Sequence, residues 1–231
     1  MAKKENIRRL FNNIAPKYDF LNHLLSFNID KIWRRKAIKC IKKQNLERVL
    51  DIACGTGDFS FLALEYGAKE LVGVDISENM FAIAIDKARK KGISDKVSFR
   101  YGDSEQLEFP DGCFSAVIVA FGVRNFENLS LGLSEMYRVL RSGGQVVILE
   151  FSRPDIFPMK QLYGFYFKNI LPRLGGAISG DKSAYEYLPN SVLFFPQGEE
   201  FLELMSCVGF TDLSQKRLTF GISTIYVGAK A

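Results

Sequence analysis

The chain has 231 residues, of which 47% are hydrophobic and 25% are charged, and its formal net charge is +5. These values are typical of a globular protein with a large core, and they exclude a disordered or fibrous chain. The most apolar run, Val117 to Val123, is too short to cross a bilayer, so an integral membrane protein is not expected. The four cysteines have no paired spacing, which predicts neither a metal site nor a disulfide framework and favours a cytoplasmic location.

Positive charge is concentrated near the N-terminus. Residues 1–48 hold 13 Lys or Arg against 4 Asp or Glu, a net charge of +9, which leaves about −4 for the remainder. We expect residues 1–45 to form a helical extension, either lying on an anionic membrane surface or capping the domain as a solvated helix pair. No basic repeat accompanies the segment, so nucleic acid is not an expected partner. Its large apolar residues are Phe11, Tyr18, Phe20, Leu21, Leu24, Leu25, Phe27 and Trp33.

The first predicted strand, Arg48 to Ala53, leads into a glycine turn, Gly55-Thr56-Gly57. A helical pattern from Phe59 to Tyr66 follows the turn. Two glycines let the backbone bend sharply and let a ligand lie close against it. Asp51 near the end of the strand and Asp58 directly after the turn place acids on both sides of it.

These acids favour one kind of ligand for the turn. Carboxylates on both sides would repel a diphosphate, and Ser60 stands where a nicotinamide-binding turn has its third glycine. A ligand with a positive charge and a ribose but no phosphate fits better, and S-adenosylmethionine has these properties. A dinucleotide and a purely structural turn are the alternatives.

An acid also follows each of the next two predicted strands. Asp75 ends the strand Glu70 to Val74, and Asp103 follows the strand Val97 to Tyr101. The first carboxylate can accept hydrogen bonds from both ribose hydroxyls, and the second from the exocyclic amine of adenine. Because the carboxyl ends of parallel strands meet at one edge of a sheet, both acids should join the acid of the first strand there. The neighbours Ile76 and Ser104 belong to the same predicted cofactor site.

A helix is predicted from Glu78 to Lys91, with Ser77 as its N-cap and Gly92 as its C-cap. Met80 lies in its first turn and could pack on the adenine, although a lone methionine more often fills a core.

The remaining elements complete an alternating pattern. Strands are predicted at Ala116 to Phe121 and Gln145 to Phe151, with a helix at Leu129 to Leu140 between them and a turn at Ser142-Gly143-Gly144. Ala120 and Phe121, at the end of the fourth strand, complete the predicted cofactor site. Residues 154–195 are rich in aromatics and are expected to cover the substrate side of the sheet.

A helix from Glu199 to Val208, stopped by Gly209, precedes the last two strands. These strands, Leu213 to Leu218 and Ile222 to Ala229, should form an antiparallel hairpin. The whole pattern predicts an α/β, Rossmann-like, mostly parallel sheet of seven strands with helices on both faces. Without an internal repeat or linker, residues 1–231 are expected to form one domain.

Two stretches are more specific than the glycine turn: Phe121-Gly-Val-Arg-Asn125 and Leu149-Glu-Phe-Ser-Arg-Pro154. With that turn they resemble the class I S-adenosylmethionine-dependent methyltransferases, and among these the quinone-biosynthesis C-methyltransferases. The resemblance covers nearly the whole chain, departing at Asn28 and Asp30, where the family usually has Gly and His. It implies ring methylation of demethylmenaquinol to menaquinol, with a ubiquinone precursor or another small apolar acceptor as alternatives.

Such a reaction needs no covalent nucleophile, because the hydroxyl oxygens make the quinol ring carbon electron-rich. Arg124 follows the fourth strand and is the expected stabiliser of the ionised quinol, with Asn125 beside it. An ion pair with Glu127 or a loop carboxylate is the alternative role of the arginine. Tyr18 is a third catalytic candidate through the resemblance, and His23 is either a base or, more commonly for a lone histidine, structural.

A prenylated quinol is flat and apolar, so it calls for an aromatic-lined slot that opens toward the membrane. The expected partners are therefore this quinol and the inner face of the membrane, contacted peripherally, with a homodimer left open. A non-catalytic binding module and a nicotinamide oxidoreductase are the alternatives from other classes. The slot candidates are Tyr18, Asn22, Tyr163, Phe165, Tyr166, Phe167, Tyr185 and Tyr187.

Overall fold

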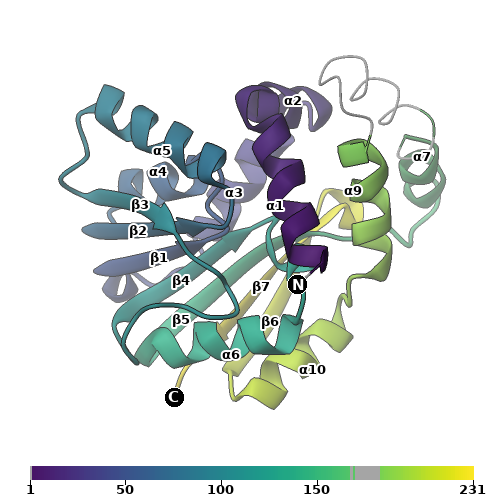
Figure 1. Ribbon diagram of the computed structural model, residues 1–231. Helices are drawn as coiled ribbons and strands as arrows, with labels where there is room; N and C mark the ends of the chain where they lie inside the picture. Colours follow the sequence, from purple (N-terminus) through teal and green to yellow (C-terminus); the bar gives the residue numbers. More distant parts are fainter. Residues whose placement is uncertain (1, 167–168, 170–182) are drawn as a thin grey trace.

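The structure is a computed structural model that describes residues 2–166, 169 and 183–231. Its strands are β1 (Arg48–Ile52), β2 (Glu70–Asp75), β3 (Val97–Tyr101), β4 (Phe114–Ala120), β5 (Leu140–Phe151), β6 (Thr211–Leu218) and β7 (Ser223–Ala229). They form one sheet in the order β3-β2-β1-β4-β5-β7-β6 (Figure 1). The first five strands are parallel, and β7 pairs antiparallel with both β5 and β6. The predicted fold class, with its antiparallel C-terminal hairpin, is confirmed.

Helices cover both faces of this sheet (Figure 1). One face packs against α3 (Ile29–Ile38), α4 (Asp58–Glu65) and α5 (Glu78–Lys91), and the other against α6 (Leu129–Val139) and α10 (Glu199–Val208). Because side chains alternate along a strand, Ile118 of β4 belongs to the first core and Val117 to the second, and both are fully buried. The predicted caps of α5 are confirmed: Ser77 accepts a hydrogen bond from the amide of Met80, and Gly92 is left-handed.

The remaining α-helices that the structure describes gather near the carboxyl ends of the parallel strands. They are α1 (Ala2–Ile14), α2 (Tyr18–Leu25), α7 (Met159–Phe165) and α9 (Ser183–Phe194) (Figure 1). The adjoining α3 is tied to the segment between β6 and β7, because Trp33 Nε1 donates to Thr219 Oγ1 at 2.8 Å. Among the described helices, none has both the length and the apolar character needed to cross a bilayer.

Two strands end one residue earlier than predicted, at the edge where the glycine turn lies. Ala53 and Phe121 leave β1 and β4 because their φ angles are +53° and +60°. This left-handed backbone is strained for residues with a side chain, costs on the order of 1–3 kcal/mol, and is often found at functional sites. The sequence gives no sign of it, because neither residue is a Gly, Asn or Asp, the types that adopt this backbone most readily.

The fifth strand begins at Leu140 instead of Gln145. Phe114 pairs with Leu140 and Ala116 pairs with Gln145, so five steps along β5 oppose two steps along β4. The predicted turn at Ser142-Gly143-Gly144 is therefore a bulge inside the strand, where Gly143 has a φ of +74°.

Candidate active site

Asp75 organises the glycine turn. Its Oδ2 accepts a hydrogen bond from the amide of Gly55 and its Oδ1 accepts one from the amide of Ser77, both at 2.8 Å. The carboxylate is buried, and this burial raises its pKa to about 6, although the backbone amides of Ser77, Gly55 and Ile76 oppose the shift. Each oxygen keeps a further acceptor position, so the side chain is oriented for two donors of a ligand.

The other predicted residues of the turn are more deeply buried. Asp51 is 1% exposed and accepts a hydrogen bond from Ser60 Oγ at 2.5 Å, and burial raises its pKa to about 7. Thr56 donates its hydroxyl to Asp19 of α2. Gly57 serves packing, because a Cβ there would lie 2.9 Å from the ring of Phe61.

A cavity lies where the parallel strands end, and we call it the strand-end cavity. Asn125 and most of the predicted cofactor residues line it. Asp51 and Thr56 instead line a smaller adjoining cavity, and Gly57 lines neither of the two. The predicted residues that the strand-end cavity brings together are Gly55, Asp75, Ile76, Met80, Asp103, Ser104, Ala120 and Phe121.

Helix α1 forms part of the same wall, which was not predicted. Lys4, Ile7 and Phe11 of this helix line the strand-end cavity. Lys4 Nζ lies 2.6 Å from Asp103 Oδ2, so the acid expected to meet adenine already has a cationic neighbour. The basic amphipathic pattern of the N-terminus was the available signal, but it fits a membrane surface equally well.

A larger cavity adjoins the first and is almost entirely apolar, and we call it the apolar cavity. Its volume is about 300 Å³, and Arg124 is the one charged residue among the described residues that line it. Phe165 of the predicted slot points elsewhere and is 59% exposed. Phe167 and the side chain of Tyr185 lie outside the described residues. The slot candidates that do line the cavity are Tyr18, Asn22, Tyr163, Tyr166 and Tyr187.

Arg124 is held by a carboxylate that the sequence did not indicate. Its Nη1 lies 2.7 Å from Oε1 of Glu150, which is fully buried, and it also donates to the carbonyl oxygen of Phe121. The predicted alternative, an ion pair with Glu127 or a loop carboxylate, is confirmed as an ion pair, but the partner is Glu150 of β5. Nε donates to Ser191 Oγ of α9 at 3.2 Å, whereas Nη2 has no acceptor among the described residues.

Tyr18 stands where the cavities meet. It lines the apolar cavity, the strand-end cavity and the smaller cavity beside the glycine turn. Burial raises the pKa of its phenol, so it remains protonated at neutral pH and can donate a hydrogen bond. Asn125 is fixed from α9, because Tyr187 Oη donates to Asn125 Oδ1 at 3.0 Å.

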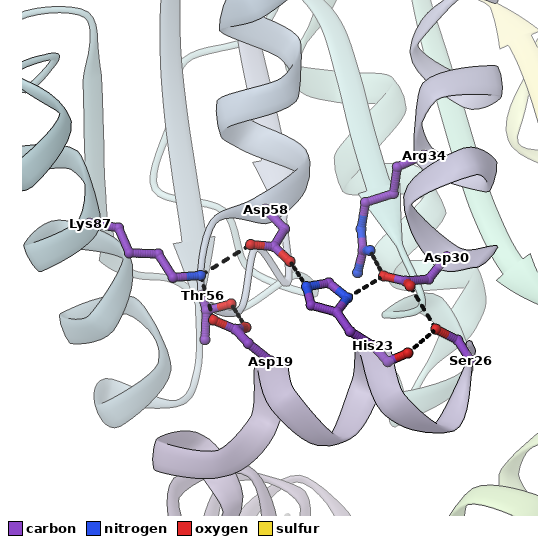
Figure 2. Close-up of polar contacts among 8 residues, drawn as sticks. All are labelled: Asp19, His23, Ser26, Asp30, Arg34, Thr56, Asp58 and Lys87. Atoms are coloured by element: carbon purple, nitrogen blue, oxygen red, sulfur yellow. Dashed lines mark hydrogen bonds and ion pairs between the residues drawn. The ribbon is translucent and has the colours of Figure 1, made fainter. Parts of the chain in front are cut away.

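His23 does not line any of these cavities. Its Nδ1 lies 2.9 Å from Asp30 Oδ2 and its Nε2 lies 3.4 Å from Asp58 Oδ2 (Figure 2). Both ring nitrogens therefore serve contacts between helices, which supports the structural alternative over a catalytic base.

Comparison with known proteins identifies the family. A family model described as the ubiE/COQ5 methyltransferase family matches residues 1–230. The chain belongs to the ubiE/COQ5 methyltransferase family. A demethylmenaquinone methyltransferase from Bacteroides fragilis is 50% identical to it over 229 residues, covering 99% of this chain and 94% of that protein. A ubiquinone/menaquinone biosynthesis C-methyltransferase UbiE from Geobacter sulfurreducens is 49% identical, covering 99% and 90%.

Solved structures share the fold of this ubiE/COQ5 family member. A SAM-dependent methyltransferase from Thermotoga maritima matches with a TM-score of 0.67 at 21% identity, covering 96% of this chain and 99% of that one. Phosphoethanolamine N-methyltransferase 2 of Haemonchus contortus, in complex with S-adenosyl-L-methionine, matches with a TM-score of 0.60 at 17% identity, covering 80% and 48%. The predicted enzyme class, an S-adenosylmethionine-dependent methyltransferase, is confirmed. The two alternatives, a non-catalytic binding module and a nicotinamide oxidoreductase, do not agree with this family. The acids around the glycine turn fit the cationic end of this cofactor.

Proposed function

We propose that the protein methylates a ring carbon of demethylmenaquinol with S-adenosylmethionine as the donor. The observation that carries the proposal is an apolar cavity whose one cation, among the described residues, is Arg124, and which shares Phe11, Tyr18 and Phe121 with the strand-end cavity. A methyl donor in one cavity and a flat apolar acceptor in the other would meet at these three residues. S-adenosylmethionine carries the methyl group on its sulfonium. The acceptor is inferred from the relatives' names, which refer to demethylmenaquinone and to ubiquinone/menaquinone biosynthesis.

The strand-end cavity would hold the adenosine part of the cofactor. Asp75 accepts the ribose hydroxyls with the two oxygens that the backbone amides already orient. Asp103 accepts the adenine amine while Lys4 neutralises its charge, and Met80 packs on the ring.

Arg124 would act on the acceptor. Its Nη2 is the donor left over after the other guanidinium nitrogens are used, so it can donate to a quinol oxygen in the apolar cavity. A guanidinium there favours the ionised quinol, whose ring carbon is the better nucleophile. Tyr18 and Asn125 orient the ring from the other side of the junction.

The proposed substrate is tested with purified protein. Demethylmenaquinol, a demethylated ubiquinone precursor as its quinol, and a water-soluble phenol are offered with S-adenosylmethionine, and the products are identified by mass. We expect methylation of demethylmenaquinol, and accumulation of demethylated menaquinone in a strain that lacks the protein. If only the ubiquinone precursor is methylated, that precursor is the substrate instead of demethylmenaquinol. If only the phenol is methylated, the substrate is not a prenylated quinol.

We expect Asp75→Ala to weaken S-adenosylmethionine binding at least tenfold, because two charge-assisted hydrogen bonds to the ribose are lost. In the native protein the same affinity should fall as the pH is lowered through about 6, where the carboxylate becomes protonated. Calorimetric titration measures both effects. Asp86→Ala, an exposed position on α5, is the control, and unchanged affinity of Asp75→Ala would remove this residue from the site.

Contact with the membrane is part of the same proposal. Large apolar side chains are exposed on α2, α7, α9 and their flanking turns, and two of them, Phe27 and Leu162, also line the apolar cavity. Exposed Lys160 lies in α7 and exposed Lys31 in α3, which suits an anionic bilayer. A prenylated quinol could pass from the bilayer into the cavity along this surface. Its other exposed residues are Phe20, Leu24, Ile156, Phe157, Phe165, Leu193 and Phe194.

Phe27→Ser with Phe194→Ser should lower binding to vesicles of anionic phospholipid about tenfold or more, because burial of each ring contributes about 1.5–3 kcal/mol. The two side chains are 75% and 82% exposed, so the fold should tolerate both changes. Leu131→Ser on α6, which is also a large apolar residue, is 45% exposed and lies outside α2, α7 and α9, is the control. Binding is measured by vesicle sedimentation. If the double variant and Leu131→Ser bind vesicles equally well, the surface formed by α2, α7 and α9 does not contact the membrane.

The arrangement of the chain follows from these roles. We regard residues 1–231 as one methyltransferase domain, in which the described parts of residues 1–45 and 154–195 close the cofactor and acceptor sides. A cytoplasmic location with contact at the inner face of the membrane belongs to the same proposal. The formation of a homodimer is a separate proposal that does not depend on this contact.

A further inference from the structure

A small polar cavity lies beside the glycine turn, and we call it the turn cavity. It shares Tyr18, Ala53, Gly55 and Ala120 with the strand-end cavity, so the two are neighbours along the ends of β1 and β4. The acids on its wall are Asp51 and Asp58. Its one cationic lining residue, among the described residues, is Arg34 of α3.

Arg34 is buried, and part of its hydrogen-bonding capacity is unused. The residue is 6% exposed, and its Nη1 donates to Asp30 Oδ2. Its Nε is buried but has no acceptor among the described residues. Buried donors are nearly always paired, and an unpaired one costs about 1–3 kcal/mol. A guanidinium that lines a cavity with a free buried N–H points to an acceptor supplied by a ligand.

The charges of the turn cavity indicate what that acceptor is. Asp51 and Asp58 would attract the cationic groups of S-adenosylmethionine, but they would repel its one anionic group, the α-carboxylate. A guanidinium is the side chain best shaped to bind a carboxylate through two N–H groups. We propose that Arg34 binds the α-carboxylate of the methionine part of the cofactor.

Arg34 is held for this role by a chain of contacts between helices. Asp30 accepts hydrogen bonds from Arg34 and from Ser26 Oγ, the latter at 2.6 Å, and lies beside His23 Nδ1 (Figure 2). The carboxylate of Asp30 is thus held by three neighbours, and it in turn orients the guanidinium of Arg34. His23 carries the chain on to Asp58 at the start of α4.

The same helices are tied to the glycine turn at a second point. Lys87 of α5 lies 2.6 Å from Asp19 and 3.0 Å from Asp58, and Asp19 also accepts the hydroxyl of Thr56 (Figure 2). These contacts keep α2 against the turn, and the contacts of Asp30 with Ser26 and His23 hold α3 beside α2, so Arg34 can reach a ligand that lies on the turn.

The test compares two ligands that differ only in the carboxylate. S-adenosylmethionine and its decarboxylated form are titrated calorimetrically into the native protein, Arg34→Gln and the control Arg35→Gln, whose side chain is exposed on the same helix. We expect the native protein and the control to prefer S-adenosylmethionine at least tenfold. Arg34→Gln should lose this preference while its affinity for the decarboxylated ligand changes less than twofold.

Two results would overturn the proposal. One is equal affinity of the native protein for the two ligands, a measurement that does not depend on how any variant folds. The other is an equal loss of both affinities in Arg34→Gln, as expected if the arginine only supports the fold. Should that variant unfold because the buried carboxylate of Asp30 loses its arginine partner, Asp30→Asn with Arg34→Gln replaces it. The inference rests on the cofactor alone, so failure of the quinol substrate would leave these binding results unchanged.

Discussion

Arg124→Ala should lower the turnover of demethylmenaquinol about 100- to 1,000-fold while S-adenosylmethionine affinity stays nearly unchanged. This is the usual effect of removing one preorganised donor from a developing oxyanion. Arg124 lines the apolar cavity but not the strand-end cavity, so its loss should affect the acceptor and spare the cofactor. Steady-state rates at saturating cofactor, together with calorimetric titration of the cofactor, separate the two quantities.

The ion pair of Arg124 with Glu150 complicates the simple variant. Removing the arginine leaves a fully buried carboxylate unpaired, which can destabilise a fold by about 3–5 kcal/mol. Arg124→Ala with Glu150→Gln avoids the unpaired charge and should show the same loss of turnover in a folded protein. Glu150→Gln alone keeps the guanidinium and is the matched control. Loss of cofactor affinity as large as the loss of turnover would argue that Arg124 supports the whole rim and not the reaction.

The acids of the cofactor site could be predicted because local pattern determines them. Asp75 follows an apolar strand, and parallel strands bring their carboxyl ends to one edge. The glycine turn and Asp51 are read from the sequence in the same way. The hydrogen bonds that orient Asp75 come from Gly55 and Ser77, which are backbone donors, so no side-chain pattern shows them.

The partner of Arg124 could not be predicted from local pattern. Glu150 reaches it because β4 pairs with β5, which sets Ala120 opposite Leu149. Glu127 is much nearer in sequence, so short-range reasoning favours it. The available signal was an acid inside an apolar strand, since a buried charge requires a partner.

The N-terminal helices show a second limit of sequence patterns. Leu21 and Trp33 are almost completely buried, whereas Phe20 and Phe27 are more than half exposed. An amphipathic pattern shows that a helix has an apolar face, but it does not show whether a bilayer or a protein core covers that face. For this reason the roles of α1 and α3 in lining the cavities were missed.

Asp51→Asn should stabilise the unliganded protein and weaken cofactor binding at the same time. Burial raises the pKa of Asp51 from 3.8 to about 7, so at pH 8 folding must bury an ionised carboxylate. Because a tenfold change in proton affinity corresponds to about 1.4 kcal/mol, removing the charge should raise the free energy of unfolding by a few kcal/mol. Asparagine can still accept the hydrogen bond from Ser60 Oγ, so the substitution changes the charge and little else.

The pH dependence identifies the cause of this stabilisation. A folded-state pKa above the unfolded value means that the contribution of Asp51 to native stability is largest below about pH 4 and declines until about pH 7. The advantage of Asp51→Asn should therefore be absent below pH 4, grow between pH 4 and 7, and stay constant above, as measured by chemical denaturation. An advantage independent of pH would contradict the buried charge as its origin.

The same carboxylate should link proton release to cofactor binding. A cationic ligand favours ionised Asp51, so S-adenosylmethionine binding near pH 7 should expel part of a proton from the native protein. Calorimetry in buffers of different ionisation enthalpy measures this release, and Asp51→Asn should abolish most of it, because Asp75, with a pKa of about 6, is already largely ionised. Ser60→Ala, which removes a donor to Asp51 but keeps the acid, should instead raise the pKa of Asp51 and increase the release. Identical proton release in the native protein and Asp51→Asn would show that the cofactor does not meet this acid.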